Sequence, residues 1–320
     1  MRALLLETID EAARAALAEQ TTTTLAPFPD AELDDGDLTT VDAIITRGRG
    51  RVTSELIARC PNLQVIGRCG VGLDNVDVHS ATAAGVAVIN APGGPTVTTA
   101  EHTVMLILAL TRQLYPQVAA VKSDDWAIRD RVTPDECAGK TLGVVGLGAI
   151  GLRVAELSAA LGMGIIAHNR TKRAREESGT SVPQLPLAEL LAEADIVSLH
   201  VASTPETRGL IGRAELEAMK AGAFLVNAAR GALVDVEALL EALDSGRLAG
   251  YAADGVDPEP PAVGDRLIHH PNTIITPHSA ALTAATYRRI CLRTVQNVLG
   301  YLTGGAYEAE SVFNAAQLNA

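Results

Sequence analysis

Short runs of apolar and β-branched residues alternate with stretches of helical periodicity along most of the chain. Runs of this kind, bounded by turn signals, are typical of strands that are buried on both faces. The predicted strands are residues 41–46, 64–66, 86–89, 141–145, 164–167, 196–200, 223–226, 250–254 and 273–275. Helical patterns of roughly 8–25 residues separate most of them. Because alternating strands and helices build parallel sheets covered by helices, the sequence predicts an α/β protein.

Two breaks in this pattern favour a division into domains. The first is the Pro- and Gly-rich stretch at 91–95, which an apolar helical pattern follows from about 98 to 121. The second is the stretch DPEPP at 257–261. A chain of 320 residues also exceeds the size at which one core keeps growing. The last helical pattern, about 282–302, has no strand after it, so it can return to the N-terminal domain.

Composition and charge narrow the class of protein and its partners. The chain is 48% hydrophobic, as expected of a soluble globular protein, and its net charge of −12 argues against nucleic acid or an acidic membrane as partner. Its four cysteines include no CxxC pair, which favours free thiols over a disulfide or zinc framework. Neither the N-terminus nor the apolar run 103–110 is long enough for a signal peptide or a membrane helix. We expect a cytoplasmic protein without a metal site.

A glycine-rich loop, GLGAIG at 146–151, directly follows the predicted strand 141–145 and opens a helical pattern. Two of its glycines allow a tight turn and close approach to a pyrophosphate, and the third lets helix and strand pack closely. The helix N-terminus offers free N–H groups to the anion. The predicted cofactor-binding residues are Gly146, Gly148, Ala149, Ile150 and Gly151. The alternative is a plain glycine-rich turn, but the flanking strand and helix favour a dinucleotide site.

The residues after the next strand bear on the choice of cofactor. An NAD site usually has an acidic residue about 20 positions past the loop, where it binds the ribose hydroxyl. Here Asn169 stands at that place, and Arg170, Lys172 and Arg173 cluster beside it. Such cations suit the 2′-phosphate of NADP, because a guanidinium offers a fork of donors. We therefore predict NADP in preference to NAD, the alternative being a solvated basic strand end.

Three polar residues late in the chain fit redox chemistry on a 2-oxo acid. They are Arg230 in the motif NAARG, Glu259 in DPEP and His278 in TPH. A planar guanidinium pairs with a carboxylate through two parallel hydrogen bonds. Histidine exchanges a proton near neutral pH, and an adjacent carboxylate fixes its tautomer and favours the imidazolium. The alternative is that Arg230 and Glu259 form a structural ion pair and His278 caps the last helix.

Together these motifs resemble the D-isomer-specific 2-hydroxyacid dehydrogenases, and among them most closely the D-3-phosphoglycerate dehydrogenase group. The further motifs of the resemblance, in the same order, are GRCGVGLDNVD at 67–77, NAPGG at 90–94, AEH at 100–102, GKTLG at 139–143 and HVASTPET at 200–207. The resemblance implies a Rossmann dinucleotide-binding domain, residues 95–283, inserted in a flavodoxin-like substrate-binding domain formed by 1–94 and 284–320. It also implies a homodimer.

The resemblance assigns a role to each member of the late polar set. Arg230 pairs with the substrate carboxylate and polarises the 2-oxo group. His278 protonates the oxygen as hydride arrives, and Glu259 holds the imidazole and favours its protonated form. Asp254 is expected to contact the nicotinamide carboxamide, and the N–H groups of Val71 and Gly72 are expected to hold the substrate carboxylate. Further cofactor contacts are expected from Thr171 and His200.

The substrate is less well defined by the motifs. Arg47 matches an arginine that phosphoglycerate-type members direct at the substrate phosphate, and Arg49 and Arg51 lie nearby, but a solvated basic loop explains all three equally well. Asn169 and Pro95 stand where such enzymes often carry aspartate and asparagine. The chain also ends about 40 residues after His278, too few for a regulatory domain. These departures put serine biosynthesis in doubt and leave the reaction type intact.

The sequence therefore predicts an NAD(P)-dependent dehydrogenase that reduces a small 2-oxo acid, with a phosphate- or phosphonate-bearing acid as the candidate substrate. One alternative is a non-catalytic nucleotide-sensing protein, because the C-terminal binding protein corepressors use the same fold. Such a protein would be expected to carry an extra partner-binding surface or tail. Another alternative is a formate- or phosphite-oxidising member of the family.

Overall fold

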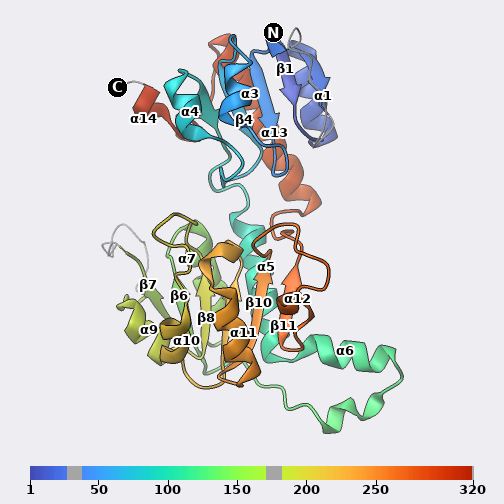
Figure 1. The fold of residues 1–320 in the computed structure, drawn as a ribbon, viewed down its shortest axis with the longest axis vertical. Coiled ribbons are helices and arrows are strands. Elements are labelled where there is room, and N and C mark those ends of the chain that lie inside the picture. Colours follow the sequence, from blue (N-terminus) through green and yellow to red (C-terminus); the bar gives the residue numbers. More distant parts are fainter. Residues whose placement is uncertain (27–37, 171–181, 319–320) are drawn as a thin grey trace. The chain divides into compact units, whose positions relative to one another are not determined.

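The computed structural model describes residues 1–26, 38–170 and 182–318. The chain divides into two compact units, each built on a parallel sheet flanked by helices (Figure 1). Unit 1 comprises Met1–Pro95 and Leu282–Ala320, and unit 2 comprises Thr96–Ala281. These boundaries lie within two residues of the expected ones. The predicted α/β class is confirmed.

The sheet of unit 1 has the strand order β2-β1-β3-β4-β5, with all neighbouring strands parallel. Its strands are β1 (Arg2–Leu5), β2 (Thr22–Leu25), β3 (Ala43–Thr46), β4 (Val65–Arg68) and β5 (Ala87–Ile89). Its longer helices are α1 (Glu11–Gln20), α3 (Ser54–Ala58), α4 (Val78–Ala83) and α13 (Ala284–Thr303). Alternate residues of β1 enter two different cores. Leu5 packs with α1 and α13, whereas Leu4 packs with α3 and its neighbours.

Strands β1 and β2 were not predicted from the sequence. The first lies in the apolar run at the N-terminus, whose alanine and leucine residues favour a helix and which contains no β-branched residue. The second is the threonine-rich stretch Thr22–Leu25, whose β-branched side chains suit a strand at the sheet edge. The predicted return of the last helix is confirmed, because α13 packs against α1 and β4 within unit 1.

The sheet of unit 2 has the order β11-β10-β9-β8-β6-β7 and is also parallel throughout. Its strands are β6 (Thr141–Val145), β7 (Gly164–His168), β8 (Ile196–Leu199), β9 (Ala223–Asn227), β10 (Leu248–Asp254) and β11 (Thr273–Thr276). Its main helices are α5 (Thr96–Thr111), α7 (Ala149–Ala160), α9 (Leu187–Glu193), α10 (Arg213–Ala218), α11 (Val236–Asp244) and α12 (Arg266–His269). Helices α5 and α7 share one core with the sheet, and α9, α10 and α11 share the other. Because the strand order reverses beside β6, the carboxyl ends of β6 and β8 form the switch point where ligands bind in such sheets.

The predicted helix from about 98 to 121 is wrong in one respect, because it consists of two helices. Helix α5 ends at Thr111, Gln113 has a left-handed φ of 47°, and α6 (Leu114–Lys122) begins in a new direction. Pro116 accounts for the break, since it lacks an N–H group and its ring would clash with the carbonyl of the preceding turn. The apolar periodicity continues across the bend and concealed it in the sequence.

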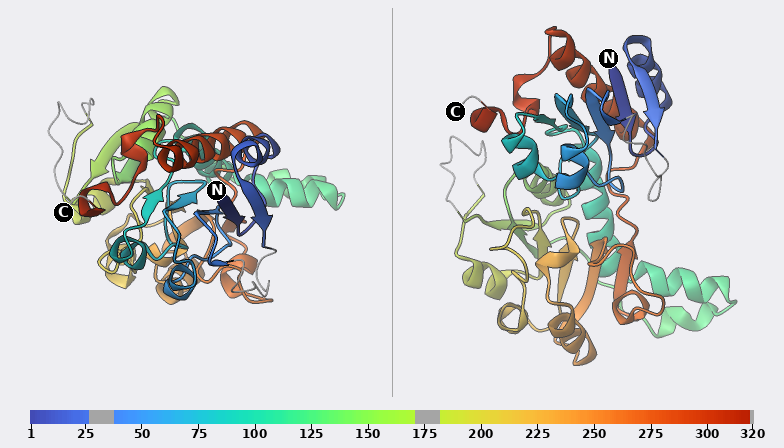
Figure 2. Two further views of the ribbon diagram at one scale, coloured as in Figure 1. Left: turned by 90° about the horizontal axis from the view of Figure 1, so that it is seen from above. Right: turned by 45° about the horizontal axis from the view of Figure 1, so that its top comes forward.

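Helix α6 and the short 3-10 helix η1 (Trp126–Asp130) extend away from the sheet of unit 2, as both views in Figure 2 show. None of the residues of α6 is buried, although several are large and apolar. Among the described residues no single helix is long and apolar enough to cross a membrane, and α5 and α6 reach that length only as a pair bent by 69°.

Candidate functional site

The glycine-rich loop follows β6 and opens α7, as predicted. Gly146 has a φ of +102°, and its N–H donates to the carbonyl of His168 at 2.8 Å. A Cβ at Gly146 would lie 2.6 Å from the carbonyl oxygen of His200, and one at Gly151 would collide with the carbonyl of Gly146. Among the described atoms, none lies within 4 Å of the corresponding point at Gly148. The fold itself therefore requires the first and third glycines, whereas the second leaves open space beside the backbone.

The start of α7 and the end of β7 fit a dinucleotide at this open space. Gly148 caps α7 without a side-chain hydrogen bond, so the first N–H groups of the helix, at Ala149 and Ile150, can receive an anion. Asn169 accepts a hydrogen bond from the Leu147 N–H at 2.8 Å through Oδ1. Its Nδ2 is buried and has no partner among the described residues. An amide donor is therefore held ready beside the loop, where an aspartate would present only acceptors.

The neighbouring cations are only partly described. Thr171, Lys172 and Arg173 lie outside the described residues, whereas Arg170 is described and exposed. The pKa of Glu206 is lowered by the Thr204 hydroxyl, by its own backbone and by the charge of Arg170. A carboxylate thus lies within electrostatic reach of the one described cation of this cluster.

His200 follows β8, at the same edge of the sheet as the glycine-rich loop. Its Nε2 is hydrogen-bonded to the Ser198 hydroxyl at 2.8 Å, and burial lowers the pKa of His200 to about 4. The ring is therefore neutral near pH 7. His200 can therefore line this edge of the sheet, but it does not offer a positive charge to a phosphate.

His278 and Glu259, which are 19 positions apart in the sequence, form a hydrogen-bonded pair. The imidazole Nδ1 lies 2.9 Å from Glu259 Oε2 and 3.2 Å from Oε1. A side chain at Gly255, whose φ is +106°, would collide with the Glu259 carboxylate, so this glycine makes room for the pair. Within the described residues His278 Nε2 makes no hydrogen bond. The carboxylate thus fixes Nδ1 and leaves Nε2 to exchange a proton.

Arg230 lies between β9 and the 3-10 helix η2 (Gly231–Leu233), in a segment organised by Asn227. The Asn227 amide donates to the Arg230 carbonyl at 2.7 Å and accepts from the Ala229 N–H at 3.1 Å. A Cβ at Gly231 would collide with the backbone of Val256, so this segment packs directly against the loop that leads to Glu259. The sequence reasoning missed Asn227, although its place at a strand end before a tight turn is a recognised signal.

Asp254 lies at the end of β10 and is 4% exposed. Its Oδ1 accepts hydrogen bonds from the Thr276 hydroxyl at 2.6 Å and the Ser279 N–H at 2.8 Å, and its Oδ2 accepts from the Ala280 N–H at 2.7 Å. The carboxylate therefore holds the turn that carries His278. The sequence reasoning gave Asp254 only a contact with the nicotinamide, which stays a prediction.

In unit 1, the loop after β4 carries the expected carboxylate-binding amides. The Asn90 side chain donates to the Val71 carbonyl at 2.8 Å, and the Ala91 N–H donates to the Gly70 carbonyl at 2.8 Å. In the described part of the chain, the N–H groups of Val71 and Gly72 have no partner, and Val71 is 39% exposed. Both N–H groups can therefore donate hydrogen bonds to an anionic ligand.

The loop after β3 is organised by Glu7, which the sequence reasoning did not foresee. Glu7 is 7% exposed, and its Oε1 accepts the N–H groups of Arg47, Gly48, Arg49 and Gly50 at 2.7–3.0 Å. The Arg47 guanidinium lies 3.4 Å from Glu7 Oε2. Burial alone would raise the pKa of Glu7, but these amides and the charge of Arg47 lower it below its usual range. Arg47 is therefore part of an internal ion pair and not simply solvated.

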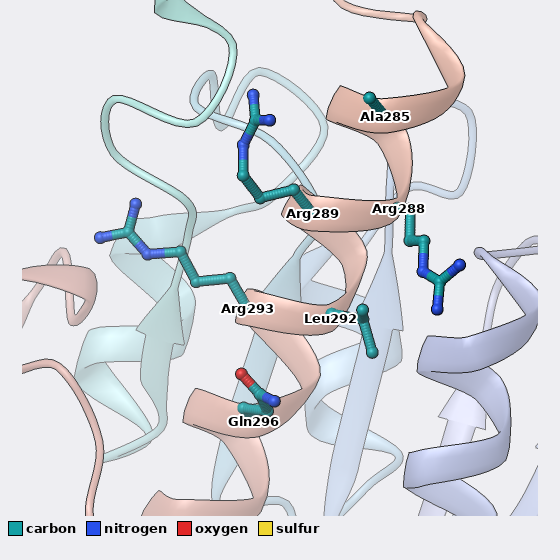
Figure 3. A pocket seen from close by; sticks show the side chains of 6 residues that line it. All are labelled: Ala285, Arg288, Arg289, Leu292, Arg293 and Gln296. Atoms are coloured by element: carbon teal, nitrogen blue, oxygen red, sulfur yellow. The ribbon is translucent and has the colours of Figure 1, made fainter.

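A solvent-open pocket of about 370 Å³ lies on one face of α13, within unit 1. Figure 3 shows its lining residues, Ala285, Arg288, Arg289, Leu292, Arg293 and Gln296. Arg289 donates to the Gly94 carbonyl at 3.1 Å and Arg293 to the Pro92 carbonyl at 2.8 Å. None of the residues expected at the cofactor or substrate site lines it. In the described ranges no group of three His, Cys, Asp or Glu residues could hold a metal ion.

Comparison with known proteins agrees with the motifs. The family model described as D-isomer specific 2-hydroxyacid dehydrogenase, NAD binding domain, matches residues 104–280. Glyoxylate reductase of Aeropyrum pernix is 39% identical over 269 residues, which cover 82% of this chain and 80% of that protein. The chain belongs to the D-isomer-specific 2-hydroxyacid dehydrogenase family. The resemblance drawn from the sequence is thereby confirmed.

Two further relatives of this family member bear on substrate and cofactor. D-3-phosphoglycerate dehydrogenase of Bacillus subtilis strain 168 is 39% identical over 270 residues, which cover 84% of this chain and 51% of the relative. The chain thus spans about half the length of the phosphoglycerate dehydrogenases that it matches. A solved NADPH-dependent glyoxylate/hydroxypyruvate reductase of Sinorhizobium meliloti, in complex with NADP and malonate, has a TM-score of 0.87 at 29% identity and covers 98% of each chain.

The structural role and the binding role of the glycine-rich loop can be separated by experiment. Gly148→Ala should leave the free energy of unfolding within about 1 kcal/mol of wild type, because its backbone conformation suits alanine. It should weaken dinucleotide binding at least tenfold, since the methyl group would occupy the space into which a pyrophosphate fits. Calorimetric titration with NADP and NAD, together with urea denaturation, measures both quantities.

Gly146→Ala serves as the matched control. Its positive φ and the 2.6 Å approach to His200 predict a loss of stability as well as of binding. Unchanged dinucleotide affinity in Gly148→Ala would show that the pyrophosphate does not approach this glycine.

Proposed function

We propose that the chain catalyses reversible hydride transfer between a nicotinamide dinucleotide and a small 2-oxo acid, giving the D-2-hydroxy acid in the reductive direction. The pairing of His278 Nδ1 with Glu259 at 2.9 Å carries the proposal, because it leaves Nε2 as a proton donor with a fixed tautomer. The names of the relatives, a glyoxylate reductase and a phosphoglycerate dehydrogenase, support the same class of substrate.

The bound dinucleotide supplies or removes the hydride at the substrate carbon. The other steps fall to side chains of the protein. The Arg230 guanidinium binds the carboxylate and draws electron density from the carbonyl oxygen. His278 Nε2 donates its proton to that oxygen as negative charge develops, and accepts it in the reverse direction. Glu259 stabilises the imidazolium and keeps the ring in one orientation.

For the cofactor, we propose NADP in preference to NAD. Asn169 Nδ2, which has no partner among the described residues, and the exposed Arg170 can both donate to a 2′-phosphate, and a neutral amide does not repel that charge. The NADPH dependence printed for the Sinorhizobium meliloti reductase supports the same choice. Glu206 opposes it, because its charge competes with the phosphate for Arg170.

For the substrate, we propose a second anionic group, with phosphate or phosphonate as the candidates. The Arg49 and Arg51 side chains are exposed, and within the described residues neither pairs with a carboxylate. Arg47 retains 30% exposure of its side chain although Glu7 offsets part of its charge. The loop can therefore present positive charge to a second anion.

We further propose a homodimer formed through α5, α6 and η1. Apolar side chains there are exposed to an extent unusual for a monomer. They include Met105 at 47%, Leu114 at 52%, Tyr115 at 66% and Trp126 at 70% exposure. A second copy of the same surface would cover them in a self-complementary contact.

Substitution of the proton donor tests the reaction. His278→Ala should lower turnover of 2-oxo acids by roughly 10²–10⁴-fold while dinucleotide affinity stays unchanged, because a positioned acid is lost. In Glu259→Gln the reductive activity should fall at a lower pH than in wild type, since the imidazolium loses its neighbouring charge. A panel of 2-oxo acids with NADPH and NADH, followed by cofactor absorbance, provides the rates.

His269→Ala, on the exposed face of α12, is the control and should behave as wild type. Tight dinucleotide binding with no efficient turnover of any acid in the panel would favour a corepressor-like protein. A pH profile that Glu259→Gln does not move would remove Glu259 from the reaction.

Cofactor choice is tested at the end of β7. Asn169→Asp combined with Arg170→Ala should shift the ratio of kcat/KM values toward NAD by about tenfold or more, because a charge-assisted pair is worth about 1.5–3 kcal/mol. The aspartate keeps the acceptor that the Leu147 N–H needs. Glu206→Gln should shift the ratio toward NADP, whereas Glu189→Gln on α9 should not. A wild-type enzyme that already prefers NAD would contradict the proposal.

The second anion is tested at the Glu7 loop. Arg47→Ala should raise KM for a phosphorylated 2-oxo acid about tenfold, the equivalent of one charged hydrogen bond, and barely change KM for pyruvate or glyoxylate. Arg14→Ala, an exposed site on α1, controls for a general change in charge. Better use of pyruvate or glyoxylate than of any phosphorylated acid by the wild type would refute the second anion.

The dimer is tested by sedimentation equilibrium. Wild type should sediment at twice the 33.3 kDa chain mass, and Tyr115→Glu should move it toward the monomer because a charge is costly at an apolar interface. Phe313→Glu, an exposed apolar position in unit 1, should leave the mass unchanged. A wild-type protein that sediments as a single chain would rule the homodimer out.

A further inference from the structure

A histidine outside the reacting set is linked by hydrogen bonds to the turn that carries His278. His102 lies on α5, which packs against β10, and its side chain is 15% exposed. Its Nε2 lies 3.0 Å from the Thr276 hydroxyl and 3.8 Å from Asp254 Oδ1. The resemblance to the family assigned it no role. Helix α5 packs against β10, seen beside it in Figure 1, and β10 is paired with β11; the ends of these two strands carry the partners of His102.

The donors and acceptors in this chain of hydrogen bonds have one consistent arrangement. The Asp254 carboxylate already accepts the N–H groups of Ser279 and Ala280. The Thr276 hydroxyl has a single proton, and the shorter of its two contacts, 2.6 Å, is to Asp254 Oδ1. His102 Nε2 must therefore donate to Thr276, which donates in turn to Asp254. The histidine thus acts at one end of a relay of bonds that ends on the His278 turn.

This turn needs external support because its backbone is strained. His278 has a φ of 52°, a left-handed conformation that costs a residue other than glycine about 1–2 kcal/mol. On one side the turn is held by the Asp254 contacts, and on the other the Thr98 hydroxyl of α5 donates to the Ala280 carbonyl at 3.0 Å. Removing one link lets the turn relax toward an unstrained conformation, which would re-aim the imidazole.

We propose that His102 is a positioning residue, which acts through Thr276 and Asp254 to keep the His278 turn in its strained conformation and Nε2 aimed at the substrate oxygen. The inference rests on the proposed function. His102 touches neither the Glu259 pair nor the glycine-rich loop in the bonds described. A displacement of about 1 Å at a reacting group can cost up to 10²-fold in rate. The effect of His102 should therefore fall on kcat.

Two substitutions of similar size separate positioning from packing. His102→Leu fills the space without a donor, whereas His102→Gln places an amide N–H near the position of Nε2. His102→Leu should lower kcat about 10- to 100-fold with KM for the dinucleotide nearly unchanged, and His102→Gln should restore most of kcat. The solvent deuterium isotope effect on kcat should rise in His102→Leu, because proton transfer becomes slower relative to the other steps.

Thr103→Val is the matched control on the same helix, since in the described part of the chain the Thr103 hydroxyl bonds the Thr99 carbonyl of α5 itself and no other group. Thr276→Val removes the middle of the relay and should reproduce the His102→Leu phenotype even if that variant folds poorly. The double variant should be no worse than either single one, because both break the same relay.

Hydrogen exchange gives a readout that does not depend on activity. The amides of Ser279 and Ala280 should exchange faster in His102→Leu and Thr276→Val than in wild type, His102→Gln or Thr103→Val. Equal exchange in all variants, or a His102→Gln variant as slow in turnover as His102→Leu, would overturn the positioning role. Failure of wild type to reduce any 2-oxo acid would instead overturn the proposed function, and exchange would still decide the role of His102.

Discussion

The arrangement of the candidate site depends on a buried carboxylate, Asp254, that accepts donors from the loop after a neighbouring strand. It lies at the end of β10, and its partners follow β11, the strand next to it. Unit 1 uses the same device. Glu7 follows β1 and accepts four amides from the loop after β3, which is again the adjacent parallel strand. In both units, backbone N–H groups compensate a buried carboxylate charge, and these hydrogen bonds fix the conformation of the loop that supplies them.

Rigidity of this kind matters because the polar groups of the site come from the ends of different strands. Arg230 follows β9, Glu259 follows β10 and His278 follows β11. Each segment has its own support: the Asn227 amide for the first, the space at Gly255 for the second, and Asp254 for the third. The parallel sheet brings the segments to one edge, and these local bonds fix their conformation.

Much of this architecture could be read from the sequence, and the omissions have physical causes. The nine predicted strands and the glycine-rich loop could be predicted because each depends on a pattern of neighbouring residues in the sequence. β1 was missed because its alanine and leucine residues favour a helix over a strand. The break at Pro116 was missed because apolar periodicity continues across it. The family motifs identified Arg230, Glu259 and His278. The supporting role of Glu7 could not be inferred, because it bonds residues 40 to 43 positions away and nothing in the local pattern marks it.

The four amides gathered on Glu7 have a consequence for the design of specificity. Successive N–H groups directed at one point form a receptor for an external anion such as a phosphate. In this chain the carboxylate of Glu7, just after β1, already occupies the position that such an anion would take. A small neutral residue at position 7 would leave the four N–H groups beside Arg47 without this acceptor. The loop would then bind an anion from solution in place of the protein's own carboxylate.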